Sequence, residues 1–139
     1  TGEEQSAILK TEVDNSQAEG YSTDPESLPS FLRTEVNNDM IGGNNTEDQV
    51  FLLSYKEAFE DYFSSDEERI CMPTAYAVQN GAYTNDDSGA CTWWLRSPDY
   101  YRGIASYVDD EGSISSGYVF PESYCIRPAL WVNLESGIF

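Results

Sequence analysis

The chain has 139 residues, of which 40% are hydrophobic and 14% aromatic, so it is long and apolar enough for a single domain, 1–139, with its own core. Seven basic residues against 25 acidic ones give a net charge of −18, which disfavours nucleic acids and anionic membrane surfaces as partners because both attract cations. There is no histidine, so Ser-His-Asp and Cys-His catalysis are excluded within the chain, and no membrane insertion is expected because no apolar run approaches about 20 residues.

The first half of the chain predicts a short helix, a long polar segment and a strand. Residues 3–10 place acidic residues before a lysine, which suits the dipole of a helix. Residues 14–48 are rich in Asn, Asp, Ser, Gly and Pro and predict a long acidic surface excursion. Residues 49–54 form a short apolar run that predicts a buried strand.

Short helices are predicted next. Ser54 and Glu57 have the spacing of a capping box, in which each residue satisfies the backbone N–H of the other. A second helix is predicted to begin at residue 65 or 66, where a serine precedes a run of acidic residues. Proline and glycine bracket residues 73–81, which predicts a third short helix.

The segment 90–139 is predicted to be strand-rich and to face a ligand. TWWLRS (92–97) is its first strand, and 104–120 predicts a hairpin around the turn DDEG. The last strand is predicted over 126–134, with Pro128 at its start or at a sheet edge because proline lacks an N–H. These patterns together predict an α+β fold with short helices packed on small antiparallel sheets and long loops.

Trp93 and Trp94 are consecutive and therefore point to opposite faces of their strand. One interpretation makes one indole a stacking platform for a ligand. The alternative, which we favour, places at least one indole in the core of an internal strand that is covered on both sides.

Three cysteines, Cys71, Cys91 and Cys125, are too widely spaced for a CxxC metal site, so no metal site is predicted from them. In an oxidising compartment Cys71 and Cys91 are the candidate disulfide because they would close a short loop. The alternative is three buried free thiols.

The phrases WWLRSP (93–98) and RPALWVNL (127–134), with GGNNTEDQVFLLS (42–54), resemble a bacterial domain family of unknown function numbered six-two-seven-three. The resemblance covers about residues 1–136. It implies a C-type-lectin-like fold related to formylglycine-generating-enzyme-like domains, with a loop-rich ligand face that could be diversified within 99–125. It also implies that this chain lacks the N-terminal part of the domain and comes from an exported or cell-surface protein.

Two groups of side chains are the candidates for the site. The first group contains Arg96 and Arg127, which either bind an anion or, as we favour, are held by carboxylates and loop carbonyls. The residues predicted to hold the structure together are Trp93, Trp94, Arg96, Arg127 and Trp131. Tyrosines separated by Ser, Gly and Asp are typical of antibody-like binding loops, although they could instead pack on the helices. The predicted ligand-binding residues are Tyr100, Tyr101, Arg102, Tyr107, Tyr118 and Tyr124.

The acidic clusters at 86–87 and 109–111 could hold calcium through their carboxylate oxygens. Neither has the spacing of a calcium loop, and turn chemistry explains both, so no cofactor is expected and calcium remains the alternative.

The sequence therefore predicts a non-catalytic module that binds a glycan or a protein ligand. The alternatives are an enzyme-like relative of formylglycine-generating oxidases that uses Cys91 or Cys125, and a structural spacer of a surface protein.

Overall fold

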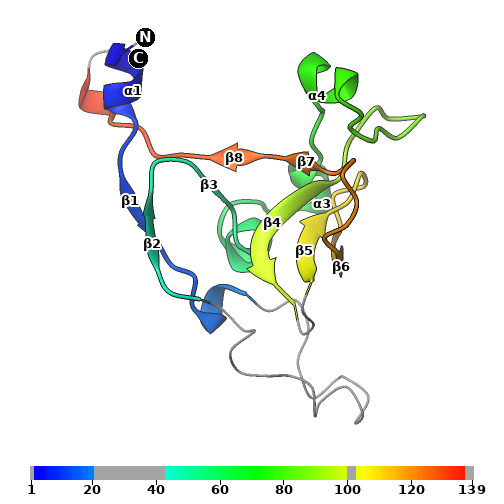
Figure 1. Cartoon of the computed structure of the whole chain (residues 1–139), viewed down its shortest axis with the longest axis horizontal. Coiled ribbons are helices and arrows are strands. Elements are labelled where there is room, and N and C mark those ends of the chain that lie inside the picture. The colour runs from blue at the N-terminus through cyan, green and yellow to red at the C-terminus, as the bar shows by residue number, and fades with distance from the viewer. Residues whose placement is uncertain (1, 21–42, 100–102, 137–139) are drawn as a thin grey trace.

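The computed structural model describes residues 2–20, 43–99 and 103–136. At its centre lies a four-stranded sheet in the order β6-β5-β4-β7 (Figure 1). Its strands are β4 (Trp93–Pro98), β5 (Ile104–Val108), β6 (Ile114–Tyr118) and β7 (Cys125–Ile126). The pairs β4–β5 and β5–β6 are antiparallel, whereas β4 and β7 run parallel. The expectation of purely antiparallel sheets is therefore wrong at β7, because the chain returns through a loop and enters beside β4 in the same direction.

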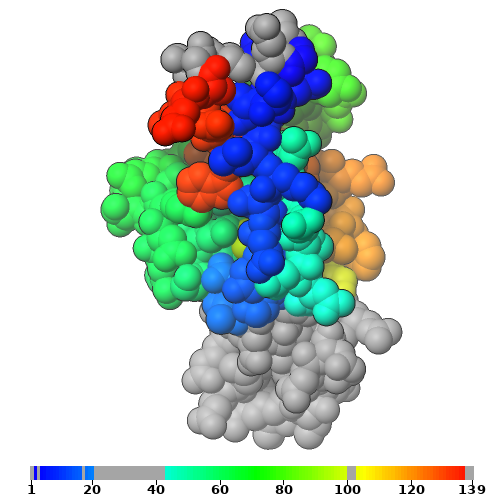
Figure 2. Space-filling view, turned by 90° about the vertical axis from the view of Figure 1, so that its left-hand side faces the viewer, coloured from blue at the N-terminus to red at the C-terminus, as the bar shows by residue number. Residues whose placement is uncertain are grey.

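Two smaller sheets flank the central one. They pair β1 (Thr11–Val13) with β2 (Thr46–Asp48) and β3 (Phe51–Leu52) with β8 (Pro128–Ala129), both antiparallel. A bridge between Ile8 and Val132 joins the N-terminal segment to the C-terminal one. Figure 2 shows the N-terminal segment running down one face of the molecule between the C-terminal residues and β2.

Helical elements in the described residues are short, and they confirm the α+β class. They are α1 (Gly2–Ala7), η1 (Gln17–Glu19), η4 (Glu57–Asp61), α3 (Asp66–Arg69), α4 (Ala75–Gln79) and η5 (Leu134–Ser136). The predicted capping box is confirmed, because the Ser54 N–H donates to Glu57 Oε2 at 2.8 Å and the Glu57 N–H donates to Ser54 Oγ at 3.0 Å. The helix that follows is a π-helical turn rather than a regular α-helix.

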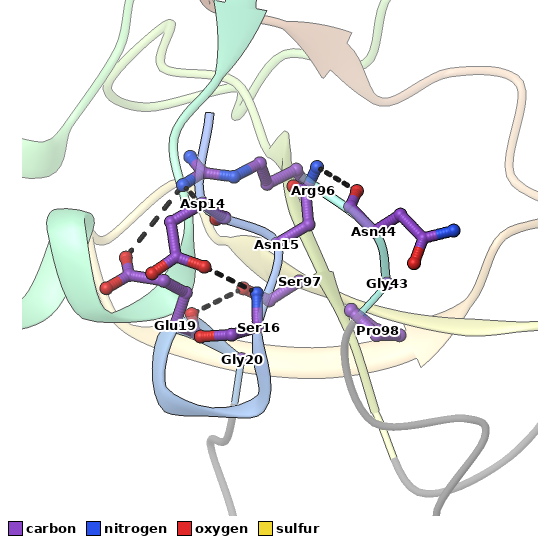
Figure 3. A pocket seen from close by; sticks show the side chains of 10 residues that line it. All are labelled: Asp14, Asn15, Ser16, Glu19, Gly20, Gly43, Asn44, Arg96, Ser97 and Pro98. Atoms are coloured by element: carbon purple, nitrogen blue, oxygen red, sulfur yellow. Dashed lines mark hydrogen bonds and ion pairs between the residues drawn. The ribbon is translucent and has the colours of Figure 1, made fainter. Parts of the chain in front are cut away.

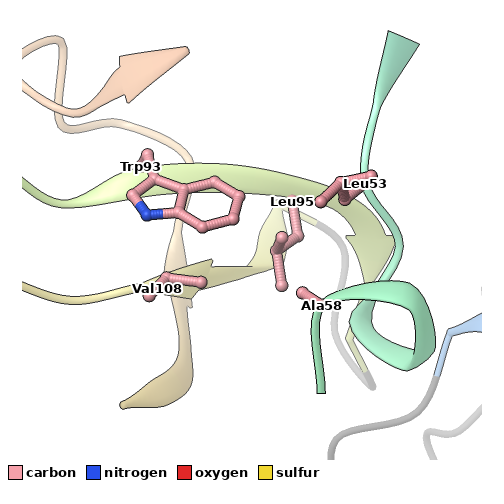
Figure 4. Packing of buried hydrophobic residues seen from close by; sticks show 5 residues of the cluster. All are labelled: Leu53, Ala58, Trp93, Leu95 and Val108. Atoms are coloured by element: carbon pink, nitrogen blue, oxygen red, sulfur yellow. The ribbon is translucent and has the colours of Figure 1, made fainter. Parts of the chain in front are cut away.

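The hydrophobic core lies between β4, β5 and the turn η4. It consists of Leu53, Ala58, Trp93, Leu95 and Val108 (Figure 4). Burial alternates along β4, with Trp93 fully buried and Leu95 2% exposed. Removing about 200 Å² of indole surface from water contributes on the order of 5 kcal/mol. The prediction of an internal strand is confirmed, since β4 has β5 on one side and β7 on the other.

Three predicted segments differ from the structure. The last strand, predicted over 126–134, is broken into β7 and β8 because the chain leaves the central sheet at Arg127 and pairs with β3 instead. Pro128 begins β8 and pairs with Leu52 in a two-stranded sheet, as expected of a residue without an N–H. The strand predicted over 49–54 is only two residues long and is half-buried. Most of the predicted excursion, 21–42, lies outside the described residues, and its last residues form β2.

The predicted hairpin between β5 and β6 is confirmed, and its turn contacts α3. The carboxylate of Asp109 accepts the backbone N–H groups of Glu111 and Ser113 at 3.0 and 2.9 Å. Gly112 has a φ of +88°, and a Cβ at this position would lie 1.8 Å from the carbonyl oxygen of Asp66. A glycine is therefore needed here both for its backbone conformation and for the close approach of α3.

Replacing this glycine is expected to destabilise the fold. Gly112→Ala should cost about 3 kcal/mol or more, because it adds steric overlap with backbone to the cost of a positive φ. Gly81→Ala is the matched control, since Gly81 has a φ of +90° but open space around the missing Cβ, and should cost about 1 kcal/mol. Urea unfolding of both variants measures the difference, and equal losses would contradict the close contact with α3.

Candidate functional site

Arg96 lies on the half-buried face of β4 and is surrounded by acceptors from the protein itself. Both of its terminal nitrogens donate to the carboxylate of Glu57, and the carbonyls of Leu52 and Asp14 accept at 2.8 and 3.0 Å. Glu19 forms a further ion pair at 3.8 Å. A cavity of about 300 Å³ opens beside this cluster (Figure 3). Because the guanidinium is already bound by carboxylates and carbonyls, its role here is to join segments of the chain.

Arg127 and Trp93 are connected through one backbone oxygen. The carbonyl of Arg69 accepts both the indole N–H of Trp93 and an N–H of Arg127, each at 3.1 Å. The Arg127 guanidinium lies 4.9 Å from the ring centroids of both Trp93 and Phe63. The sandwich of a cation between two aromatic rings fixes the joint between β7 and β8 against β4.

Arg69 was not predicted to be important, yet it is 3% exposed. Its Nε donates to the carbonyl of Gly112 at 2.8 Å, and its terminal nitrogen pairs with Asp66. The sequence around it, SSDEER, reads as an ordinary acidic first turn that ends in a cation. Nothing in that local pattern indicates that this cation is buried.

The tyrosine pocket, a cavity of about 410 Å³, opens next to the β5–β6 turn at one end of the central sheet. Its lining residues are Tyr83, Thr92, Tyr107, Asp109, Asp110, Ser123 and Tyr124. They come from four separate places: the loop after α4, the residues just before β4, the end of β5 with its turn, and the loop before β7. Of these lining residues, only the two acidic ones carry a charge at neutral pH.

Aromatic contacts hold the wall of the pocket in place. Tyr107 and Tyr124 meet edge to face with ring centroids 5.2 Å apart. Trp94 supports both rings, at 5.9 Å from Tyr107 and 5.0 Å from Tyr124. Trp94 and Tyr107 are direct partners across β4 and β5, and the Tyr107 ring lies 3.2 Å from the missing Cβ of Gly117 on β6. The absence of a side chain at Gly117 therefore leaves room for the phenol ring.

Backbone contacts bring the remaining lining residues to the same place. The N–H of Tyr83 donates to the carbonyl of Ser123 at 2.9 Å, which joins the loop after α4 to the loop before β7. Asn85, on the first of these loops, donates to the carboxylate of Asp110. Tyr83 was not predicted as a site residue, because its position depends on pairing with a loop 40 residues away.

The pocket lining includes two acidic side chains and no basic one. Burial raises the pKa of the Tyr124 phenol above its ordinary value, and the neighbouring Tyr107, Asp110 and Tyr83 raise it further. Tyr124 therefore stays protonated at neutral pH and keeps an O–H donor in the pocket.

The predicted ligand-binding residues divide into three groups. Tyr107 and Tyr124 come together in the tyrosine pocket. Tyr118 lies outside it, 58% exposed, and stacks on Phe120 with centroids 5.5 Å apart. Tyr100, Tyr101 and Arg102 lie outside the described residues.

The five residues predicted to hold the structure together lie in different parts of the fold. Trp93 is in the core, and Trp94 is half-buried behind the tyrosine pocket. Arg96 and Arg127 join segments as described above. Trp131 is 48% exposed and meets Tyr62 edge to face at 6.3 Å, so it packs at the periphery rather than in the central core.

The three cysteines lie close together near the start of β4, where Cys91 contacts both Cys71 and Cys125. They are free thiols in the structure, and Cys71 and Cys91 face each other in an antiparallel bridge. Burial raises the pKa of the Cys91 thiol, and its contacts with Cys125 and Cys71 raise it further. The disulfide between Cys71 and Cys91 stays a prediction.

The two acidic segments, 86–87 and 109–111, lie in turns that are held by side-chain-to-backbone hydrogen bonds. Asp109 binds the backbone of its own turn, and the side chain of Asn85 accepts the N–H groups of Asp87 and Ser88 at 2.9 Å. In the part of the chain that the structure describes, no group of three or more His, Cys, Asp or Glu side chains is arranged to hold a metal ion.

The fold and the pocket define an α+β domain with an aromatic, acidic cavity at the end of its central sheet. Over residues 1–134 the chain matches the family described as domain of unknown function (DUF6273). The chain therefore belongs to that family. Neither the curated proteins nor the solved structures include a significant match. Among the described residues, no helix has the length and apolar character needed to cross a membrane.

Arg96 is expected to be essential for stability. Arg96→Met keeps most of the side-chain volume but leaves the half-buried carboxylate of Glu57 without its cation, which should cost about 3–5 kcal/mol. Lys10→Met is the control, because Lys10 pairs with Glu47 at an exposed site and should change little. Chemical unfolding measures both, and a loss as small for Arg96→Met as for the control would contradict the role assigned to Arg96.

Cys91 is expected to resist alkylation in the folded protein. Because its pKa is raised, little reactive thiolate forms near pH 8, and burial blocks access as well. Iodoacetamide labelling followed by peptide mass spectrometry should show Cys91 reacting at least about tenfold more slowly than in the unfolded chain. Cys71, which is only half-buried, serves as the internal comparison. Labelling of both at the same rate in the folded state would contradict the burial of Cys91.

Proposed function

We propose that the chain is a non-catalytic ligand-binding module of an exported or surface-displayed protein, with a glycan or a protein as its ligand. The observation that carries the proposal is the tyrosine pocket, in which the rings of Tyr107 and Tyr124 pack on Trp94 beside an open cavity of about 410 Å³. This volume lies within the range of ordinary ligand sites, which is about 300–1,000 Å³.

Rigid aromatic rings suit this role. Tyrosine offers a large contact area at a low entropy cost and keeps a polar tip for hydrogen bonding. In the pocket, Tyr107 and Tyr124 are already fixed by each other and by Trp94. A ligand would therefore meet side chains that need little further ordering, which increases affinity.

We also propose that the fold is a variant of the C-type-lectin-like fold. The signature WWLRSP forms the central strand β4, and the described residues combine short helices with small sheets. The segments near the two ends of the chain pair with each other at Ile8 and Val132, and the loops around the tyrosine pocket supply a loop-rich face.

The raised pKa of Cys91 argues against this thiol as the nucleophile of an enzyme, since a reactive cysteine needs a lowered pKa. The open tyrosine pocket and the exposed ring of Tyr118 favour it over a spacer whose tyrosines are packed inside.

Glycan and peptide arrays test the proposal. The chain is expected to bind a defined subset of ligands, and Tyr124→Ala should weaken binding at least about tenfold because it removes one wall of the pocket. Tyr76→Ala is the matched control, since Tyr76 is 76% exposed on α4 and does not line the pocket.

Circular dichroism spectra that match that of the unchanged chain are required as the control that both variants are folded. Equal binding by Tyr124→Ala, Tyr76→Ala and the unchanged chain would show that the pocket is not the ligand site.

A further inference from the structure

The tyrosine pocket combines two kinds of group that attract cations. Three tyrosines, Tyr83, Tyr107 and Tyr124, are among its lining residues, and so are the two acidic residues Asp109 and Asp110. An aromatic ring attracts a cation through the negative face of its π-system. A carboxylate adds a full negative charge and accepts hydrogen bonds from an ammonium group.

Neither carboxylate is neutralised by the protein within the described residues. Asp109 accepts backbone N–H groups of its turn with one oxygen, and Asp110 accepts the neutral amide of Asn85 with one oxygen. The described ion pairs involve other acids: Lys10 with Glu47, Lys56 with Glu19 and Asp61, Arg69 with Asp66, and Arg96 with Glu57 and Glu19. With respect to the residues that the structure describes, each of the two pocket carboxylates therefore keeps an oxygen and its charge for a ligand.

The contrast with the cavity beside Arg96 shows why the tyrosine pocket is the better site for a cation. That other cavity is lined by Arg96, whose guanidinium binds the carboxylate of Glu57 and so neutralises its negative charge. The lining of the tyrosine pocket has two acids and no basic residue. The net charge of −18 in addition draws positively charged partners towards the surface as a whole.

We infer that the tyrosine pocket binds an ammonium group, and specifically the side chain of a lysine presented by a protein ligand. This inference rests on the proposed binding function and selects a protein over a glycan as the ligand. The methylene chain of the lysine packs against the phenol rings, and its ammonium group reaches Asp110 and Asp109. The Tyr124 O–H and the carbonyls of the surrounding loops supply polar partners for the peptide that carries the lysine.

Nuclear magnetic resonance titration of the labelled chain with Nα-acetyl-L-lysine amide tests the inference. We expect the amide signals of Asp110 and Tyr124 to shift, and we expect the affinity to fall as salt screens the charges. The Nε-acetylated compound has the same chain without the positive charge and should bind at least about tenfold more weakly.

A matched pair of variants separates the charge from the shape of the site. Asp110→Asn keeps the volume and an oxygen for Asn85 but removes the charge, and it should weaken lysine binding about tenfold. Asp87→Asn removes an equal charge from an exposed residue outside the pocket lining and should leave the affinity unchanged. Equal weakening by both variants would mean that general attraction to an acidic surface explains the binding, and it would overturn the inference.

Two further outcomes distinguish this inference from the proposed function. If the charged and acetylated compounds bind the pocket equally, or if neither shifts Asp110 and Tyr124 while array ligands still depend on Tyr124, the lysine inference is wrong and the binding function stands. If no ligand depends on Tyr124, both are wrong.

Discussion

The carbonyl oxygen of Arg69 is the acceptor on which the arrangement of the central strand depends. Trp93 is fully buried, so its indole N–H needs a partner inside the protein, and the Arg69 carbonyl supplies it. The same oxygen also binds Arg127, while the Arg69 side chain binds the carbonyl of Gly112. Hydrogen bonds of one residue thus connect α3, β4, the β5–β6 turn and the joint between β7 and β8.

This connection extends to the tyrosine pocket because β4 has two different faces. Trp93 and Leu95 point into the core, whereas Trp94 points to the opposite face and supports Tyr107 and Tyr124. Fixing the backbone of β4 from the core side therefore fixes the support of the pocket wall as well. The pocket lining itself comes mostly from loops, where side chains can differ without disturbing the core.

Local sequence patterns predicted the elements that depend on neighbours in the chain. The Ser54–Glu57 capping box and the β5–β6 hairpin follow from residues a few positions apart. Long-range pairings could not be predicted, because β1, β2, β3 and β8 are only two or three residues long and show no periodicity. For the same reason the sequence indicated Tyr107 and Tyr124 as binding residues but not Tyr83, and gave no sign that Arg69 is buried.

The adjacent indoles of Trp93 and Trp94 create an ambiguity during folding. If β4 paired one position out of step, the two tryptophans would exchange faces, and the hydrophobic gain from burying an indole would be nearly the same. The native alignment is therefore distinguished by other groups: the indole N–H bond to Arg69, the contact with Arg127, and the irregular pairing with β5 between Trp94 and Pro98. The same slip would also replace Leu95 by Arg96 in the core. Correct strand alignment in this domain thus depends on polar partners and on the residue that follows the two indoles, not on indole burial alone.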